Sequence, residues 1–220
     1  MYVEPIFVLI ALLPLIAHLL QLSTLRLSGR VLVTTGGRDI AALGFAIAGL
    51  VAVGPGELFF PKAAAGLFGP WVWVALFTLY SLVVSLIALT AKPKLVTYGR
   101  TPEQLFQPLM TSALKLDADA TGDREALSVH LPTLKVHLRI VGHPWIDTAT
   151  IESFEHIPSV NFWNSLLGHL REQAESTKAA SPRRGVSMLL IAIVLLGVVI
   201  WQGYGYNEQL VEGFRQWLWR

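Results

Sequence analysis

Four long apolar runs constrain this chain more than any other feature. They cover Pro5–Leu25, Ile40–Phe60, Trp71–Ala91 and Val186–Trp201 of a 220-residue sequence. The hydrocarbon core of a bilayer is about 30 Å thick, and a helix needs about 20 apolar residues to cross it. The first three runs meet that length, and the fourth reaches it by extending through Gly203–Tyr206. We therefore predict an α-helical membrane protein with four transmembrane helices.

Composition agrees with a membrane location and excludes several kinds of site. Only 15% of the residues are charged and 53% are hydrophobic, whereas soluble domains carry about 25% charged residues. The chain has no cysteine, which excludes disulfides, thiolate catalysis and Cys-ligated metal centres. The net charge of +2 is too small to favour nucleic acid as a partner. We expect membrane lipid and other protein subunits as partners.

The basic residues that flank the apolar runs predict how the chain is oriented. Lys and Arg collect in the cytoplasmic loops of membrane proteins. We therefore expect an inner (plasma) membrane protein with both termini outside and residues 92–185 in the cytoplasm. The first run has no basic segment before it and no cleavage site after it, so we expect it to be retained as a span. The predicted inside carries nine basic residues and the outside three: Arg26, Arg30, Arg38, Lys92, Lys94, Arg100, Lys178, Arg183 and Arg184 against Lys62, Arg215 and Arg220.

The second apolar run is rich in small residues at helical spacing. Ala42 and Ala46 are four residues apart, and so are Gly44 and Ala48. Small residues at this spacing let transmembrane helices approach closely. We predict that this run is the central packing helix of the membrane part.

Two ionisable residues lie in or beside the apolar runs and are candidate functional groups. His18 follows Pro14 by four residues, and a proline there leaves the carbonyl of Ile10 without its helical hydrogen bond. Glu57 follows Pro55-Gly56 near the predicted outer boundary. A hydrogen-bonded histidine and a solvated carboxylate at the membrane interface are the simpler interpretations. A proton or cation site is the alternative for Glu57.

The polar stretch between the third and fourth runs predicts a small folded domain. Apolar residues alternate with polar ones over 127–131 and 134–140, which is typical of a hairpin with one buried face. Helical spacing follows Thr101-Pro102, a capping sequence completed by Gln104, and a second helix begins after Ser159. With strands over 94–99 and 145–154, the order is βαβββα, a two-layer α+β domain. The predicted parts are transmembrane helices 1–3 (1–91), the α+β domain (92–177), a linker (178–185), the fourth helix (186–206) and an amphipathic interfacial tail (207–220).

The predicted hairpin carries four residues that we expect on one exposed face: His130, Lys135, His137 and Arg139. Such a face is cationic and suits an anion or an acidic surface of a partner protein. An ordinary solvated sheet face is the simpler interpretation.

An acidic loop before the hairpin is the best local motif for a metal. Asp117, Asp119, Thr121 and Asp123 supply oxygens at alternate positions, like the start of a calcium-binding loop. The twelfth position is Ser128, where such a loop requires Glu. The same residues resemble the DxDxT motif of haloacid dehalogenase-type phosphatases, but that motif follows a buried strand and a helix is expected here. A solvated acidic turn remains the simpler interpretation.

The sequence contains no phosphate-binding glycine loop, nucleophile elbow or HExxH motif. We therefore expect neither a cofactor nor a catalytic residue. The first hypothesis is a membrane scaffold, sensor or assembly protein that acts through its cytoplasmic domain. The alternatives are a non-catalytic subunit of a membrane transport complex and a membrane-bound enzyme of unknown reaction.

Overall fold

The computed structural model describes residues 5–54, 68–143, 147–154, 158–176, 183–205, 211–213 and 215. Backbone contacts divide the chain into two compact units. The helical unit comprises Met1–Leu22, Ile40–Leu89 and Ser187–Arg220, and the sheet unit comprises Ser23–Asp39 and Thr90–Val186. The chain therefore passes between the two units four times.

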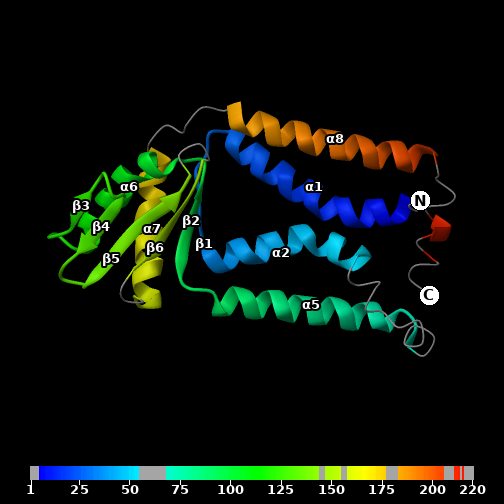
Figure 1. Cartoon of the computed structure of the whole chain (residues 1–220), viewed down its shortest axis with the longest axis horizontal. Coiled ribbons are helices and arrows are strands. Elements are labelled where there is room, and N and C mark those ends of the chain that lie inside the picture. The colour runs from blue at the N-terminus through cyan, green and yellow to red at the C-terminus, as the bar shows by residue number, and fades with distance from the viewer. Residues whose placement is uncertain are drawn as a thin grey trace. The chain divides into compact units, whose positions relative to one another are not determined.

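Four helices are long and apolar enough to cross a membrane, as the sequence predicted. The second helix ends before Pro55-Gly56, earlier than the apolar run suggested, and the fourth extends beyond Trp201 as expected. Of the predicted interfacial tail, only residues 211–213 and 215 are described, so that interpretation stays a prediction. The four helices are α1 (Pro5–Leu27), α2 (Gly36–Val53), α5 (Trp71–Thr90) and α8 (Arg183–Gly205) (Figure 1).

Two glycines of α2 make close approaches to its neighbours, which supports its predicted role as the packing helix. A Cβ added to Gly44 would lie 2.6 Å from Val84 of α5, and the carbonyl of Gly44 accepts a 2.6 Å hydrogen bond from the Tyr80 hydroxyl. A Cβ added to Gly49 would collide with the backbone oxygen of Ile10 in α1. That oxygen is the one that Pro14 leaves without a helical hydrogen bond.

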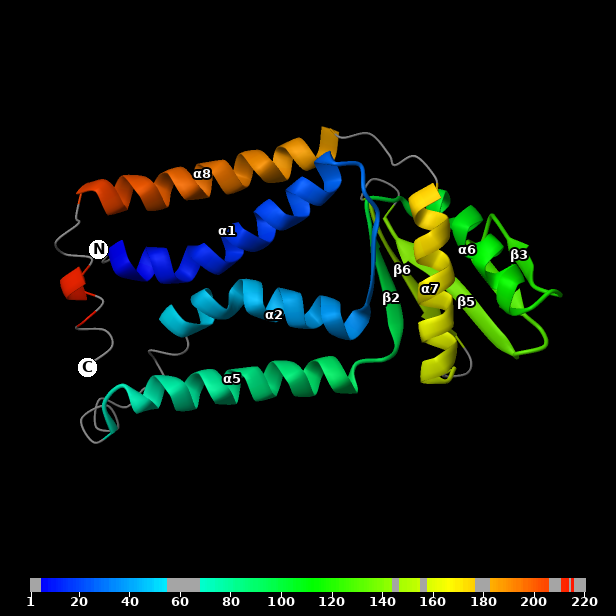
Figure 2. The same ribbon diagram turned by 180° about the vertical axis from the view of Figure 1, so that it is seen from behind.

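The sheet unit contains six strands, and every neighbouring pair is antiparallel. The order across the sheet is β1-β2-β6-β5-β4-β3, so strand β2 pairs with β6 although α6 and three strands separate them in sequence. Helices α6 and α7 pack on one face of the sheet (Figure 2). The elements are β1 (Leu32–Thr35), β2 (Lys94–Tyr98), α6 (Pro102–Leu116), β3 (Thr121–Asp123), β4 (Ser128–Leu131), β5 (Val136–Gly142), β6 (Thr148–Ser153) and α7 (Val160–Ser176).

The local signals in the polar stretch are confirmed where the structure describes them. The hairpin forms between β4 and β5, with Val129 opposite Leu138. The side chain of Gln104 accepts a hydrogen bond from the Thr101 N–H at the start of α6, as in a capping box. The hydroxyl of Ser159 accepts the N–H of Phe162 at the start of α7.

The expected βαβββα order is corrected by two further strands, β1 and β3. Strand β1 lies in the connection between α1 and α2, which was predicted as part of the transmembrane region. Its four residues, LVTT, are too few for a period-two pattern to be recognised. Strand β3 is the sequence TGD, whose three residues are exposed and have the composition of a turn.

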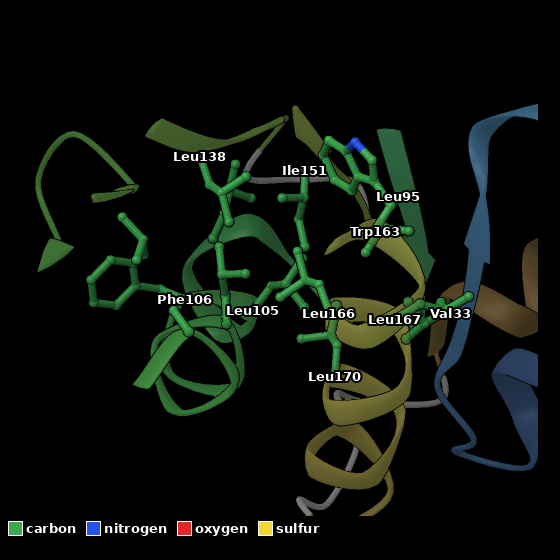
Figure 3. Close-up of a cluster of buried hydrophobic side chains, with 14 of the residues drawn as sticks. Val33, Leu95, Leu105, Phe106, Leu138, Ile151, Trp163, Leu166, Leu167 and Leu170 are labelled. Carbon is green, nitrogen blue, oxygen red and sulfur yellow. The ribbon is translucent and has the colours of Figure 1, made fainter. Parts of the chain in front are cut away.

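The core of the sheet unit lies between the sheet and the two helices (Figure 3). Leu105 and Leu109 enter it from α6, and Leu166 and Leu170 from α7, all with no exposed surface. The core also includes Val33 of β1, which is 2% exposed. The connection between α1 and α2 therefore contributes to the same core as the rest of the sheet unit.

Three polar contacts hold this connection and the adjoining helix ends to α7 and to the sheet. The guanidinium of Arg171 in α7 donates two hydrogen bonds, of 3.1 and 3.0 Å, to the carbonyl of Val33. The hydroxyl of Tyr98 donates to Asp39 in the first turn of α2. Burial raises the pKa of Tyr98 well above its ordinary value, and the charge of Asp39 raises it further, so this hydroxyl keeps its proton.

The third contact is a buried ion pair at the end of α1. The Arg26 guanidinium lies 3.5 Å from the carboxylate of Asp147, and the two side chains are only 8% and 9% exposed. Arg26 also donates a 3.2 Å hydrogen bond to the Thr148 hydroxyl on β6. The end of α1 is thus held by the strand at the middle of the sheet.

We expect Arg26→Ala to destabilise the sheet unit by about 3–5 kcal/mol, because Asp147 would remain buried without its partner. Thermal unfolding of the purified full chain in detergent measures this loss. The double variant with Asp147→Ala should be more stable than Arg26→Ala alone. Lys115→Ala is the control, because its ion pair with Glu172 is exposed and such pairs contribute about 0–1 kcal/mol. Equal effects of Arg26→Ala and Lys115→Ala would contradict the assignment.

Candidate functional site

The face of the sheet opposite α6 and α7, called the open face below, carries most of the predicted cationic residues. Along β5 the side chains of Val136, Leu138 and Ile140 are buried, while those of His137 and Arg139 alternate with them and face away from the core. The register places His130 of β4 directly opposite His137, and Ser128 opposite Arg139. The sequence therefore identified three residues that do share one face.

Lys135 does not lie on the open face with the other three. It occupies the turn between β4 and β5, with a positive φ of 52°. A lysine in this left-handed conformation is uncommon. The positive charge of Lys135 is therefore at the turn that ends the hairpin.

The two facing histidines are in direct contact. The ring centroids of His130 and His137 are 3.8 Å apart, with the ring planes tilted by 37°. The Nδ1 of His130 is buried and has no hydrogen-bond partner among the described residues. The pair forms a compact polar patch beside Arg139.

A pocket of about 290 Å³ opens next to this patch. Phe154, which follows β6, lies at one side, and the Arg139 guanidinium carbon is 5.3 Å from the centre of its ring. At this distance the ring attracts the cation electrostatically. Phe154 is 62% exposed, a large apolar surface for a residue beside a charged group. The pocket is lined by Ala126, Ser128, His137, Leu138, Arg139 and Phe154.

Arg139 has no ion-pair partner among the residues that the structure describes. Glu152 lies opposite it in the register of β5 and β6, but its carboxylate is paired with Lys94 at 4.0 Å. The guanidinium edge that is not against Phe154 therefore has hydrogen-bond donors to offer. Arginine donors in a planar fork match a carboxylate or a phosphate.

The acidic loop serves the fold of the hairpin in this structure. Asp117 is only 5% exposed and ends α6. Its Oδ1 accepts hydrogen bonds from the Asp119 N–H at 3.1 Å and the Thr133 hydroxyl at 3.0 Å, and its Oδ2 accepts the Thr133 N–H at 2.9 Å. Asp123 accepts the N–H groups of Glu125 and Ala126 and closes the turn between β3 and β4.

No three acidic or histidine side chains converge on a metal position within the described ranges. Thr121 and Asp123 lie on β3, opposite His130 and Ser128 in the register, while Asp117 bonds to the turn between β4 and β5. The calcium interpretation thus gains no support from the geometry and stays a prediction.

The hydrogen bonds to Asp117 lower the pKa of its carboxyl group. Desolvation raises the pKa of this carboxyl, but the donors from Asp119, Thr133 and Leu134 together outweigh it and hold the pKa below its ordinary value. A carboxyl whose pKa is lowered on folding stabilises the fold above its unfolded pKa, about 3.9. That stabilisation is lost as the pH falls through the lower folded value.

We therefore expect Asp117→Asn to lower the melting temperature of the full chain at pH 7. The difference from the unsubstituted chain should narrow as the pH falls below about 4, because the Asp117 carboxylate of that chain then becomes protonated. Melting in detergent across pH measures this. Asp119→Asn is the control, because Asp119 is exposed. A difference that stays constant with pH would show that the charge of Asp117 contributes nothing.

The two membrane candidates lie elsewhere. His18 is in the middle of α1, partly buried, and its Nε2 has no hydrogen-bond partner among the described residues. Glu57 lies outside the described residues. Neither joins the cluster on the open face.

The residues that sequence reasoning missed are Ser128, Phe154 and Ala126. Ser128 lies opposite Arg139 in the hairpin, so the pairing of β4 with β5 would have identified it. Phe154 carries no local signal, because its position depends on the pairing of β6 with β5, where its N–H bonds to the His137 carbonyl at 3.0 Å.

Comparisons with known proteins provide no further guide. No protein-family model, curated protein or solved structure matches this chain. The pocket on the open face is thus assigned from its own chemistry.

Proposed function

We propose that this chain is a multi-pass inner-membrane protein that acts through binding of a partner by its sheet unit, as a scaffold, sensor or assembly subunit. The proposal places both termini outside and the sheet unit in the cytoplasm. The distribution of basic residues along the sequence supports that orientation.

The main support for the proposal is that the sheet unit is built from two separate segments of the chain. The segment Ser23–Asp39 joins α1 to α2 and supplies a strand to the sheet, and Thr90–Val186 supplies the rest. Both ends of each segment continue into a membrane helix. A domain that only needed anchoring would require one such connection. Four connections suit a domain whose position relative to the membrane matters to a partner.

The sequence contains no recognisable set of catalytic residues, which favours a binding function over an enzymatic one. The open face offers an arginine, two histidines and a phenylalanine beside a small pocket. No motif in the sequence supplies a nucleophile with its base. The same groups are well suited to recognise an anionic group.

The absence of cysteine makes the orientation directly testable. We expect single cysteines at Glu103 and Arg124 to react with a membrane-impermeant maleimide only after the cells are opened. A cysteine at Lys62 should react in intact cells. Reaction at Glu103 or Arg124 in intact cells would refute the cytoplasmic location.

A second experiment tests action through a partner. Mild-detergent purification of the tagged full chain from its native membrane should recover at least one further protein in a fixed ratio. The same chain carrying Arg26→Ala, with the sheet unit destabilised, should recover less of it. Recovery of the chain alone would contradict the proposal.

A further inference from the structure

We propose that the pocket on the open face binds a carboxylate side chain in an acidic, partly apolar segment of the partner protein. This inference rests on the proposed function and names the chemistry of the contact. Arg139 is the central residue of the site. His137, Ser128 and Phe154 complete it.

The argument begins with the placement of Arg139. Its guanidinium lies over the Phe154 ring, 5.3 Å from the ring centre, and Glu152 opposite it is paired with Lys94. The guanidinium fork is planar and pre-organised, so it loses less conformational freedom for each hydrogen bond that it forms. Its fork of N–H donors matches the two oxygens of a carboxylate.

The size of the pocket limits what can fill it. At about 290 Å³, the pocket lies at the lower end of the range for small-molecule sites, which is about 300–1,000 Å³. It accommodates one or two side chains of a peptide and leaves little room for a nucleotide. The ring of Phe154 and the side chain of Ala126 give such a segment an apolar surface beside the charged one.

The place of the pocket in the sheet favours a protein segment over a lipid headgroup. The sheet unit is joined to the four long helices through both ends of the β1 segment, through the residues before β2 and through those after α7, a helix that packs on β1 and β2. Strands are about 4.8 Å apart, so β5 and β4 lie about 14 and 19 Å across the sheet from β1. The pocket is thus on the strands farthest from these attachments, apart from β3.

Charge also favours an acidic occupant. His130 and His137 adjoin Arg139 on the open face, and Lys135 lies at the end of the same hairpin. The carboxylate of Asp123 accepts turn N–H groups, and that of Glu152 lies 4.0 Å from the Lys94 ammonium. Arg139 and Lys135 are cations that this hairpin presents to an incoming carboxylate.

The test uses the full chain in nanodiscs of uncharged lipid and a fluorescein-labelled peptide of sequence Glu-Phe-Glu-Glu-Leu-Glu. Fluorescence anisotropy measures binding, and the same peptide with Gln in place of Glu is the comparison. We expect the acidic peptide to bind and the Gln peptide to bind roughly tenfold more weakly. Arg139→Gln should weaken binding of the acidic peptide by a similar factor.

Arg124→Gln is the matched control. It removes the same charge from the turn between β3 and β4, outside the pocket, and should change the affinity less than about twofold. An unchanged melting temperature of the Arg139→Gln chain shows that it folds. Phe154→Ala should also weaken binding, because it removes the support of the guanidinium.

Three results would overturn the proposal. They are equal binding of the two peptides, equal loss in Arg124→Gln and Arg139→Gln, and displacement of the peptide by nanodisc lipid with anionic headgroups. The first two indicate unspecific attraction and the third a lipid site. Because this measurement uses purified protein, it is independent of sidedness and of co-purification. If the peptide binds but maleimide labelling shows that the sheet unit faces outward, the binding site is supported and only the proposed location is refuted.

Discussion

The pairing of β1 with β2 is the constraint on which the rest of the structure depends. Four residues between the first two membrane helices, Leu32–Thr35, lie antiparallel to Leu95–Tyr98. The ladder brings Val33 into the core and places Arg26 and Asp39 where Asp147 and Tyr98 can bind them. Without β1, strand β2 would be the edge strand of the sheet, paired only with β6.

The two faces of the sheet differ in the side chains that they carry. The face covered by α6 and α7 provides the apolar burial that stabilises the unit. On β4 and β5 the open face carries His130, His137 and Arg139 at positions that alternate with core residues. The connections to α1, α2 and α5 are at β1 and β2, and the pocket lies at β4 and β5. A continuous hydrogen-bonded sheet therefore connects the pocket with the strands next to these helices.

Local patterns in the sequence were sufficient for the helices, the hairpin and their caps. Apolar length predicts a membrane-crossing helix, alternation predicts the β4–β5 pair, and Thr101 with Gln104 predicts the start of α6. The remaining features depend on pairings between distant residues. Strand β1 has no pattern of its own, and the partnership of β2 with β6 follows from the packing of the whole core.

The same distinction applies to the candidate site. His130, His137 and Arg139 were expected on one face because they alternate with apolar residues along one hairpin. Phe154 could not be recognised, since only the closing of β6 on β5 brings it beside Arg139. Asp117 was considered as a metal ligand, whereas the fold directs backbone and hydroxyl donors to its oxygens. The place of Phe154 beside Arg139 and the structural role of Asp117 both depend on contacts between distant residues, which a local motif does not encode.

The most direct test of this account is a cross-link between β1 and β2, made possible by the absence of native cysteine. Thr34 and Val96 are directly opposite in the register, and such pairs have Cα atoms about 4.5–5.5 Å apart, within the reach of a disulfide. The chain with Thr34→Cys and Val96→Cys should form an intramolecular disulfide on mild oxidation in native membranes. The diagonal pair Leu32→Cys and Val96→Cys should not. Failure of the first pair, or equal cross-linking of both, would contradict the strand pairing that joins the membrane helices to the sheet.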